Sequence, residues 1–381
     1  GLGQRDQTDL LLDFEYGYEL FPTFSSFTRE DEENDILTQE LRLVSTGGGR
    51  LNWIAGLFYY NLEERLESRE FTPGFDQFAV DNFGGVQLRP DALEYLEVTN
   101  VDRTETALYG EVSYLFESDW EITLGARLYE FEDKVSGGFG LPLYDTVFLG
   151  ADPNITFGAI GIASNQTDDS GSLLKLNLSR NFGDDILGYL TISEGYRIGG
   201  LNAVPQCTPE QLTSGNQELC ATEDEILIAA DTTTNYEIGV HSTLADGQLT
   251  LNAAVYYVDW EDIQIDDTTI NGSLPITSNG GKATSQGIEL SANWRINPNW
   301  RLSGALALNE AELAESLGQP FNDNSILGDS LTGPLTTPEG SRLPGSPEEQ
   351  VSLTLMHDRT LSNGWDLNVQ YGVCLLYTSD A

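Results

Sequence analysis

The sequence predicts an all-β protein, a transmembrane antiparallel β-barrel, and three observations support this prediction. Long segments alternate apolar and polar residues with period two, which is typical of strands with one apolar and one polar face. Short turns alternate with long, acidic, glycine- and proline-containing loops, as in barrels whose turns face the periplasm and whose loops face outward. Tryptophans follow several of the short turns in the apolar register, where an interfacial belt of aromatic rings is expected.

The composition excludes several other classes of protein. The 381 residues contain no apolar run near the roughly 18 residues that a membrane-spanning helix needs. A formal net charge of −43 excludes a nucleic-acid-binding protein, because such proteins carry a basic surface. Intrinsic disorder is the alternative for so acidic a chain, but 16 Phe, 16 Tyr and 6 Trp in alternating register argue against it.

The clearest hairpin spans residues 231–265. Its first half alternates apolar and polar residues up to Ala245, Asp246 and Gly247, which form a tight turn in which glycine tolerates positive φ. The second half resumes the alternation. The apolar side consists of Tyr236, Ile238, Val240, Leu244, Leu251, Ala253, Val255 and Tyr257. Long strands with a polar second face are the repeating unit of a transmembrane barrel.

The remaining chain follows the same plan. Short turns are expected near residues 48, 118, 184, 298 and 363, and long loops at about 66–100, 137–167, 200–230, 266–280 and 316–346. We expect strands of about 10 to 16 residues, about 12 of them between residues 35 and 372, in one meander with nearest-neighbour pairing. Residues 8–30 are expected to supply one more. A soluble sandwich shows similar alternation, but its strands usually have about 5–6 residues.

Four tryptophans, Trp53, Trp120, Trp300 and Trp365, each follow a short turn on the apolar register. Indole rings are amphipathic, so we interpret them as an aromatic girdle at the periplasmic interface of the membrane. Tryptophans of an ordinary hydrophobic core are the alternative. Their shared topological position favours the girdle.

Several short segments resemble the barrel of TonB-dependent outer-membrane receptors. Each one alone is a weak signal, but together they follow the family's order over most of the chain. They are residues 39–43 (QELRL), 56–60 (GLFYY), 195–202 (GYRIGGLN), 235–239 (NYEIG), 255–265 (VYYVDWEDIQI) and 286–290 (QGIEL). The family barrel has about 22 strands around a plug domain. The resemblance therefore implies a partial barrel domain over residues 1–372, without the plug, the TonB-binding motif or the last strands. Residues 373–381 (VCLLYTSDA) break the alternation and are interpreted as a non-native tail.

The resemblance implies active uptake across the bacterial outer membrane. The ligand would be a ferric siderophore or a similar small molecule, imported with energy that the TonB complex supplies through the plug. Outer-membrane lipid and lipopolysaccharide are the other implied partners, and neither a cofactor nor an enzymatic activity is expected. A passive porin or a surface ligand-binding barrel is the alternative, and a soluble all-β adhesin is the third. The resemblance does not identify the ligand.

Charged residues on the polar register are expected to face the lumen. These candidates are Arg127, Lys175, Arg197, Glu237, Glu289 and Arg295. Cross-strand ion pairs that keep the wall polar are the favoured interpretation, and contact with the plug or the passing ligand is the alternative. With His241 and His357 as its only histidines, the chain is poorly supplied for a histidine triad or a histidine-rich metal site.

Two further expectations concern the loops. Cys207 and Cys220 are close together in one loop and are predicted to form a disulfide in an oxidising compartment, with two free thiols as the alternative. The acidic residues are expected in the long loops and their flanks, because a charge that faces the bilayer midplane is unfavourable. Acidity spread evenly over the surface is the alternative.

Overall fold

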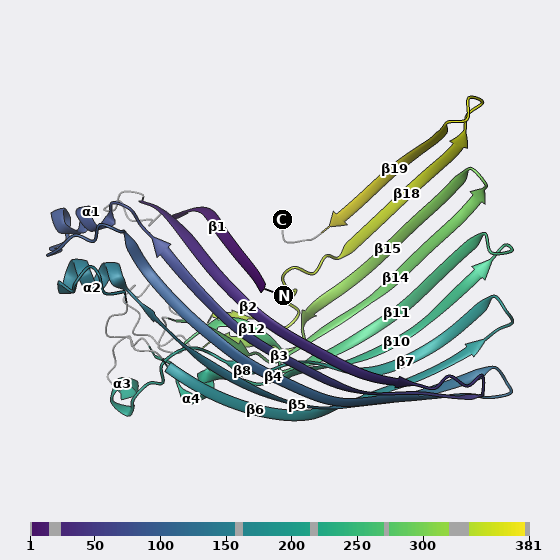
Figure 1. The fold of residues 1–381 in the computed structure, drawn as a ribbon, viewed down its shortest axis with the longest axis horizontal. Coiled ribbons are helices and arrows are strands. Elements are labelled where there is room, and N and C mark those ends of the chain that lie inside the picture. Colours follow the sequence, from purple (N-terminus) through teal and green to yellow (C-terminus); the bar gives the residue numbers. More distant parts are fainter. Residues whose placement is uncertain are drawn as a thin grey trace.

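The computed structural model describes residues 2–14, 24–156, 163–213, 220–269, 274–319 and 335–377. Within these ranges, 13 long strands form one antiparallel sheet that curves into an open trough (Figure 1). In sheet order they are β1 (Leu2–Phe14), β2 (Phe24–Val44), β3 (Leu51–Phe71), β4 (Leu93–Leu115), β5 (Trp120–Gly140), β6 (Ala163–Asn181), β7 (Ile186–Arg197), β10 (Asp231–Leu244), β11 (Leu249–Glu261), β14 (Lys282–Asn297), β15 (Trp300–Leu313), β18 (Glu349–Thr360) and β19 (Asp366–Tyr377). Among the described strands, β1 and β19 are the edges.

The predicted meander is confirmed, because each long strand pairs only with the long strands before and after it. The predicted extra strand is displaced: β1 is Leu2–Phe14, and residues 24–30 already belong to β2. The predicted strand lengths are too short for β2 to β6, which have 19 to 23 residues. Beyond the bilayer the outer face of a strand no longer meets lipid and can carry polar side chains. The alternation in hydrophobicity therefore ends before the hydrogen-bonded ladder does, and the loops predicted from residues 66 and 137 begin later.

The end of β19 bears on the predicted domain boundary at residue 372. Val373 pairs with Leu353 and Tyr377 pairs with Glu349, so the ladder continues through residues 373–377. Residues 378–381 lie outside the described ranges. The non-native origin of this tail stays a prediction.

The two ends of the sheet differ in their connections. Short turns join the strands at one end, and in the β10–β11 turn both Ala245 and Asp246 have φ of 55°, as mirror-image hairpin turns require. The opposite end carries the long loops with helices α1 (Phe75–Asn82), α2 (Pro142–Leu149), α3 (Pro209–Thr213) and α4 (Glu223–Ile226) (Figure 1). The loops also form the strand pairs β8 (Gly200–Leu201) with β9 (Leu227–Ile228), β12 (Gln264–Thr268) with β13 (Pro275–Asn279), and β16 (Leu317–Gln319) with β17 (Leu335–Thr337). No helix in the described ranges is long and apolar enough to cross a membrane.

The apolar face of the long sheet is its exposed face. Leu124, Leu174 and Ile238 are 56%, 57% and 60% exposed. A soluble sheet buries its apolar face against a core, so this arrangement favours a barrel wall in contact with lipid over a sandwich. Buried apolar side chains gather instead under the long loops. The largest such cluster contains Phe139, Val204, Ala221, Ile226, Leu274 and Ile276.

Candidate functional site

The inner face of the sheet, opposite the exposed leucines, carries a connected set of polar side chains. Arg127 Nη2 of β5 donates to Glu105 Oε1 of β4 at 2.6 Å, and the Tyr196 hydroxyl of β7 donates to the same oxygen at 2.7 Å. The ring of Tyr129 stacks on that of Tyr196 with centroids 3.9 Å apart, and the Arg127 guanidinium lies 4.9 Å from the Phe58 ring centre. Glu105 is buried, and two strong donors compensate for the loss of water around its carboxylate.

The other predicted lumen residues divide into paired and unpaired groups. Lys175 Nζ lies 2.9 Å from Glu111 Oε1, and the Tyr189 hydroxyl donates to Glu237 Oε1 at 2.6 Å. Glu289 and Arg295 are exposed, and no ion pair joins either of them to another residue that the structure describes. Cross-strand pairing therefore accounts for Arg127 and Lys175, as the favoured interpretation expected, but not for Glu289 and Arg295.

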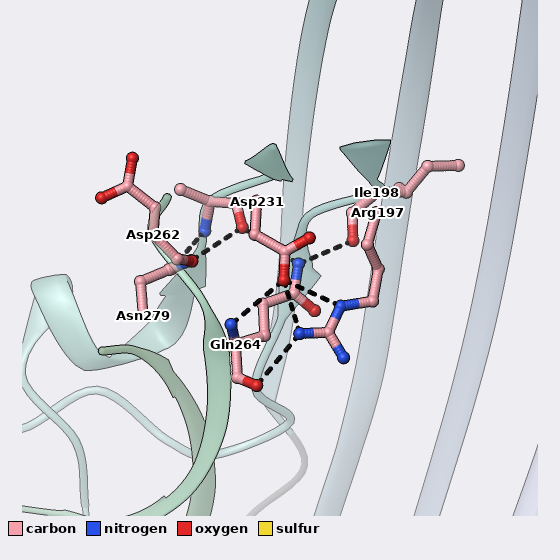
Figure 2. A network of polar contacts seen from close by, with 7 residues as sticks. Arg197, Ile198, Asp231, Asp262, Gln264 and Asn279 are labelled. Carbon is pink, nitrogen blue, oxygen red and sulfur yellow. Dashed lines mark hydrogen bonds and ion pairs between the residues drawn. The ribbon is translucent and has the colours of Figure 1, made fainter. Parts of the chain in front are cut away.

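Arg197 lies at the centre of a denser network near the long loops. Its Nε donates to Asp231 Oδ2 at 2.9 Å, its Nη2 donates to the backbone oxygen of Gln264 at 3.0 Å, and Gln264 N donates to Asp231 Oδ2 at 3.1 Å (Figure 2). The Asp231 side chain is 2% exposed. The guanidinium also lies 5.6 Å from the ring centre of Trp260. One buried carboxylate thus joins the end of β7, the start of β10 and the start of β12.

Two amide side chains extend this network into the neighbouring loop. Gln264 Nε2 donates to the backbone oxygens of Ile198 at 3.0 Å and Ala229 at 3.1 Å. Asn279 exchanges hydrogen bonds with the backbone of Ala229, at 3.0 Å to the oxygen and 2.7 Å from the nitrogen, and donates to Asp262 O at 2.7 Å (Figure 2). Backbone groups that no ladder satisfies are satisfied here by side chains, which fixes one loop to the other.

Asn202, in the GYRIGGLN segment, makes a similar connection. Its Nδ2 donates to Glu225 O and Thr277 O at 2.7 Å each, and its Oδ1 accepts from Thr277 N at 2.9 Å. Sequence reasoning singled out this segment for its family resemblance but assigned Asn202 no role. It also missed Asp231, Gln264 and Asn279. Only the position of Asp231 at the start of a clear strand could have drawn attention to it.

Another buried carboxylate lies on β5. Asp133 is fully buried, and its Oδ1 accepts from Arg103 Nε at 2.8 Å. Arg103 Nη2 also donates to the backbone oxygen of Gly199 at 3.4 Å. Asp133 Oδ2 has no hydrogen-bond partner within the described ranges. A Cβ on Gly200 would lie 3.2 Å from that oxygen, so the absence of a side chain at Gly200 allows this close approach.

The β3–β4 and β5–β6 loops form one helical cap. Ala79 of α1 and Leu143 and Val147 of α2 make its small core. The Arg89 side chain is fully buried and forms a two-point ion pair with Asp91, at 2.8 and 3.0 Å. Its Nη1 donates across the loops, at 3.1 Å to the Thr146 hydroxyl and 3.0 Å to Ile155 O.

The pKa values of two carboxyl groups in the cap are shifted in opposite directions. Burial raises the pKa of Asp145 above its ordinary value, although the positive charge of Arg89 opposes this effect. Hydrogen bonds from the backbone and side chain of Asn154 lower the pKa of Asp152. Asp145 is therefore harder to ionise in the folded cap than in an unfolded chain, and Asp152 is easier to ionise.

The remaining predicted residues lie as follows. Cys207 and Cys220 are joined by a disulfide with Cα atoms 4.9 Å apart, within the range such a bond requires. Trp53, Trp120, Trp300 and Trp365 all lie at the short-turn end, in register with the exposed apolar side chains. Trp294 shares that face and end, 44% exposed, and sequence reasoning missed it because it precedes its turn.

The acidic residues are not confined to the long loops. Many lie on the flanks, at the long-loop ends of β2 to β4, and include Glu30, Asp31, Glu32, Glu33, Asp35, Glu63, Glu64, Glu67, Glu70, Glu94 and Glu97. The short turns also carry acids, namely Glu117, Asp119, Asp184, Asp185 and Asp246. The acids on these flanks agree with the predicted concentration in the long loops and their flanks, whereas the acids of the short turns were not part of that prediction. Among the described residues, no group of three or more potential ligands is placed to hold a metal ion.

Comparison with known proteins identifies what this architecture is similar to. A family model described as TonB dependent receptor-like, beta-barrel, matches residues 4–380. Pesticin receptors of Yersinia enterocolitica and Yersinia pestis are 27% and 26% identical over 332 residues, which are 85% of this chain and 42% of each relative. The chain thus spans less than half the length of these relatives.

Solved structures show the same fold. The ferric yersiniabactin uptake receptor FyuA from Yersinia pestis matches with a TM-score of 0.66 and 19% identity, over 93% of this chain and 45% of that one. The alcaligin outer-membrane receptor FauA from Bordetella pertussis matches with a TM-score of 0.53 and 12% identity, over 94% of this chain and 49% of that one.

Proposed function

Because the chain belongs to the TonB dependent receptor-like β-barrel family, we propose that it forms the wall of a receptor that imports a ferric siderophore. Members of this family are bacterial outer-membrane proteins, so the exposed leucines of the sheet face lipid. The family match confirms the resemblance that the short segments indicated. FyuA and FauA, named for ferric yersiniabactin and alcaligin, support a siderophore as the ligand.

The observation that carries the proposal is the division of the sheet into two faces beneath cross-linked loops. The outer face is apolar and exposed, whereas the inner face holds paired charges such as Arg127 with Glu105. Above it, the network of Arg197, Asp231 and Gln264 holds two long loops together. Such a wall can enclose a polar interior and hold a ligand-capturing rim without making or breaking a covalent bond.

Energy for import would come from the TonB complex, acting on a plug that fills the barrel. The ferric siderophore is the cargo, and the proposed roles of the wall are to exclude lipid from the interior and to position the loops. Lipopolysaccharide would surround the long-loop end. A passive porin shares the wall but needs neither TonB nor a tightly bound ligand.

The test is uptake of radioactive iron by cells that lack their own siderophore receptors and express the complete receptor. A panel of ferric siderophores of different chemistry is offered, in the presence and absence of TonB. Saturable uptake of one siderophore that disappears without TonB supports the proposal. Uptake that persists without TonB would instead identify a passive porin. TonB-dependent uptake of a different ligand class, such as cobalamin or a carbohydrate, would retain the receptor and reject the siderophore.

A further inference from the structure

The outer face of the sheet has an unusual charge pattern near the short turns. The whole chain has 61 acidic residues against 18 Lys and Arg. Yet among the outward positions of β2 to β19 nearest the short turns, no Asp or Glu is described, and the Arg, Lys and His side chains there are Arg180, Arg359 and His357. The tryptophans of the same end lie among them. This part of the outer face therefore carries basic side chains at the depth expected for lipid headgroups.

Arg180 is held in place by two aromatic rings. It pairs across the sheet with Trp120 of β5 and Gly188 of β7. Its guanidinium lies 5.3 Å from the Trp120 ring centre and 5.1 Å from that of Phe182, within the range of cation–π attraction. A Cβ on Gly188 would lie 3.2 Å from Phe182 Cε2, so this glycine leaves room for the ring. The rings of Trp120 and Phe182 therefore hold the Arg180 guanidinium between them, and Gly188 leaves the space that the Phe182 ring needs.

No hydrogen bond joins the Arg180 guanidinium to another residue that the structure describes. Its Nε is buried and has no hydrogen-bond partner within the described ranges. The neighbouring turns contain Asp119, Asp184 and Asp185, but no ion pair joins any of them to Arg180 in the part of the chain that the structure describes. The two terminal Nη groups of Arg180 form a planar fork of donors that matches phosphate oxygens. Stacking orients this fork but satisfies none of its donors.

We propose that Arg180, Trp120 and Phe182 form a binding site for the headgroup phosphate of a phospholipid in the periplasmic leaflet of the outer membrane. Short turns of such barrels face the periplasm, and aromatic belts mark the depth of the headgroups. Basic positions at this depth attract anionic lipid headgroups. The proposal concerns lipid binding and does not depend on which ligand the receptor imports.

The neighbouring surface favours a lipid over a free anion. On the side of Arg180 away from the turn, the outward register continues through Leu178, Leu176 and Leu174, and Leu190 lies beside Leu178 on β7. Leu174 and Leu190 are 57% and 41% exposed. A phosphate at Arg180 would therefore place its acyl chains along an apolar strip, whereas inorganic phosphate would gain nothing from that strip.

The experiment measures phospholipid retained by the complete receptor, purified in mild detergent, during titration with phosphatidylglycerol followed by native mass spectrometry. Arg180→Gln is expected to weaken the tightest lipid-binding event about tenfold, the loss of a charge-assisted phosphate contact. Arg295→Gln is the matched control. It removes one positive charge at the same end of the sheet but from the inner face, and it is expected to leave lipid retention unchanged.

Two further measurements keep the outcome interpretable. Arg180→Lys should bind with intermediate affinity, because an ammonium keeps the charge but loses the planar fork. If Arg180→Gln fails to fold, Trp120→Leu removes one of the two rings that stack on Arg180 while keeping an apolar side chain. This variant should also weaken lipid retention. Equal retention by wild type and Arg180→Gln would overturn the proposal. So would complete displacement of the lipid by millimolar inorganic phosphate, which would indicate a free-anion site.

Discussion

The ring of Tyr256 on β11 lies over Gly287 of β14, and a Cβ on Gly287 would come within 2.6 Å of the Tyr256 hydroxyl oxygen. That hydroxyl donates to Asn309 Oδ1 of β15 at 2.9 Å, so one side chain spans three strands. The same relationship recurs along the inner face. Tyr109 covers Gly56, Tyr129 covers Gly171 and Tyr189 covers Gly239. A one-residue slip of either strand would replace the glycine with a side chain and break the contact, so these pairs help to set the register.

Gly287→Ala is therefore expected to destabilise the barrel by about 2 kcal/mol, because the added methyl group meets both the Tyr256 ring and the backbone oxygen of Leu308. The measurement is the denaturant midpoint of the folded band on a heat-modifiability gel. Gly372→Ala is the matched control, since its nearest neighbour would be Thr354 Oγ1 at 3.9 Å. Equal midpoints for both variants would show that the tyrosine does not need the glycine.

Arg89 should hold the helical cap together. Arg89→Met removes the bonds to Thr146 and Ile155 and leaves the half-exposed Asp91 to water, with an expected local loss of about 2 kcal/mol. Hydrogen exchange of residues 75–82 and 142–149 should accelerate together. Arg65→Met, at a half-exposed arginine of β3, serves as the control and should leave the cap unchanged. Faster exchange in only one of the two helices would contradict the idea of a single unit.

The cap should also respond to pH through Asp145. Its folded pKa is raised by burial, so the stability it contributes is fully present below its ordinary value of 3.8 and is lost as pH rises through the folded value. At neutral pH, Asp145→Asn is expected to slow exchange of α2, after correction for the intrinsic rate. Asp152→Asn should act in the opposite direction. The lowered pKa of Asp152 gives a contribution that is present above 3.8 and lost as pH falls. We expect the effects of the two substitutions on the exchange rate of α2 to change with pH in opposite directions. Parallel changes would contradict this prediction.

The Cys207–Cys220 bond should protect its loop. Closing a loop of 13 positions contributes about 3 kcal/mol by restricting the unfolded chain. Non-reducing peptide mapping of the complete receptor should recover the two cysteines in one cross-linked species. Replacing both with Ser should speed proteolysis between them, while Cys374→Ser, which removes the exposed free thiol, should not. Alkylation of both cysteines without reductant would show two free thiols instead.

The tryptophans at the short-turn end should report the depth of the membrane interface. Trp53, Trp365 and Trp294 are 41%, 73% and 44% exposed on the outer face. Brominated lipids with bromine near the headgroup should quench their fluorescence more strongly than lipids brominated at the chain ends. Trp260 is the internal comparison, because it packs with Ile263, Ala283 and Leu313 near the long loops. A single-tryptophan variant at 260 should show little quenching by either lipid.

The sequence predicted the fold because hydrophobic alternation is a local property. The faces of β10 and β11, with Ile238 opposite Val255, follow directly from it. The lengths of β2 to β6 did not, since the ladder continues beyond the alternating segments, as in the pairs Glu30 with Ser68 and Glu67 with Val98. The polar register also identified which charged residues face the inside of the sheet. Their partners, such as Glu105 for Arg127, depend on register across strands far apart in sequence and could not be deduced.

The network around Asp231 limits how these loops can change independently. Gln264 and Asn279 belong to the β11–β14 connection, whereas Asp231, Ile198 and Ala229 belong to the β7–β10 connection. If only the β11–β14 connection were exchanged for that of a relative, Asp231 would stay buried with fewer donors. The Ala229 carbonyl would lose its hydrogen-bond partners. Recombination that alters ligand preference is therefore expected to move both connections as one block. Chimeras for engineering should take their crossover points in the short turns on either side, at residues 182–185 and 298–299.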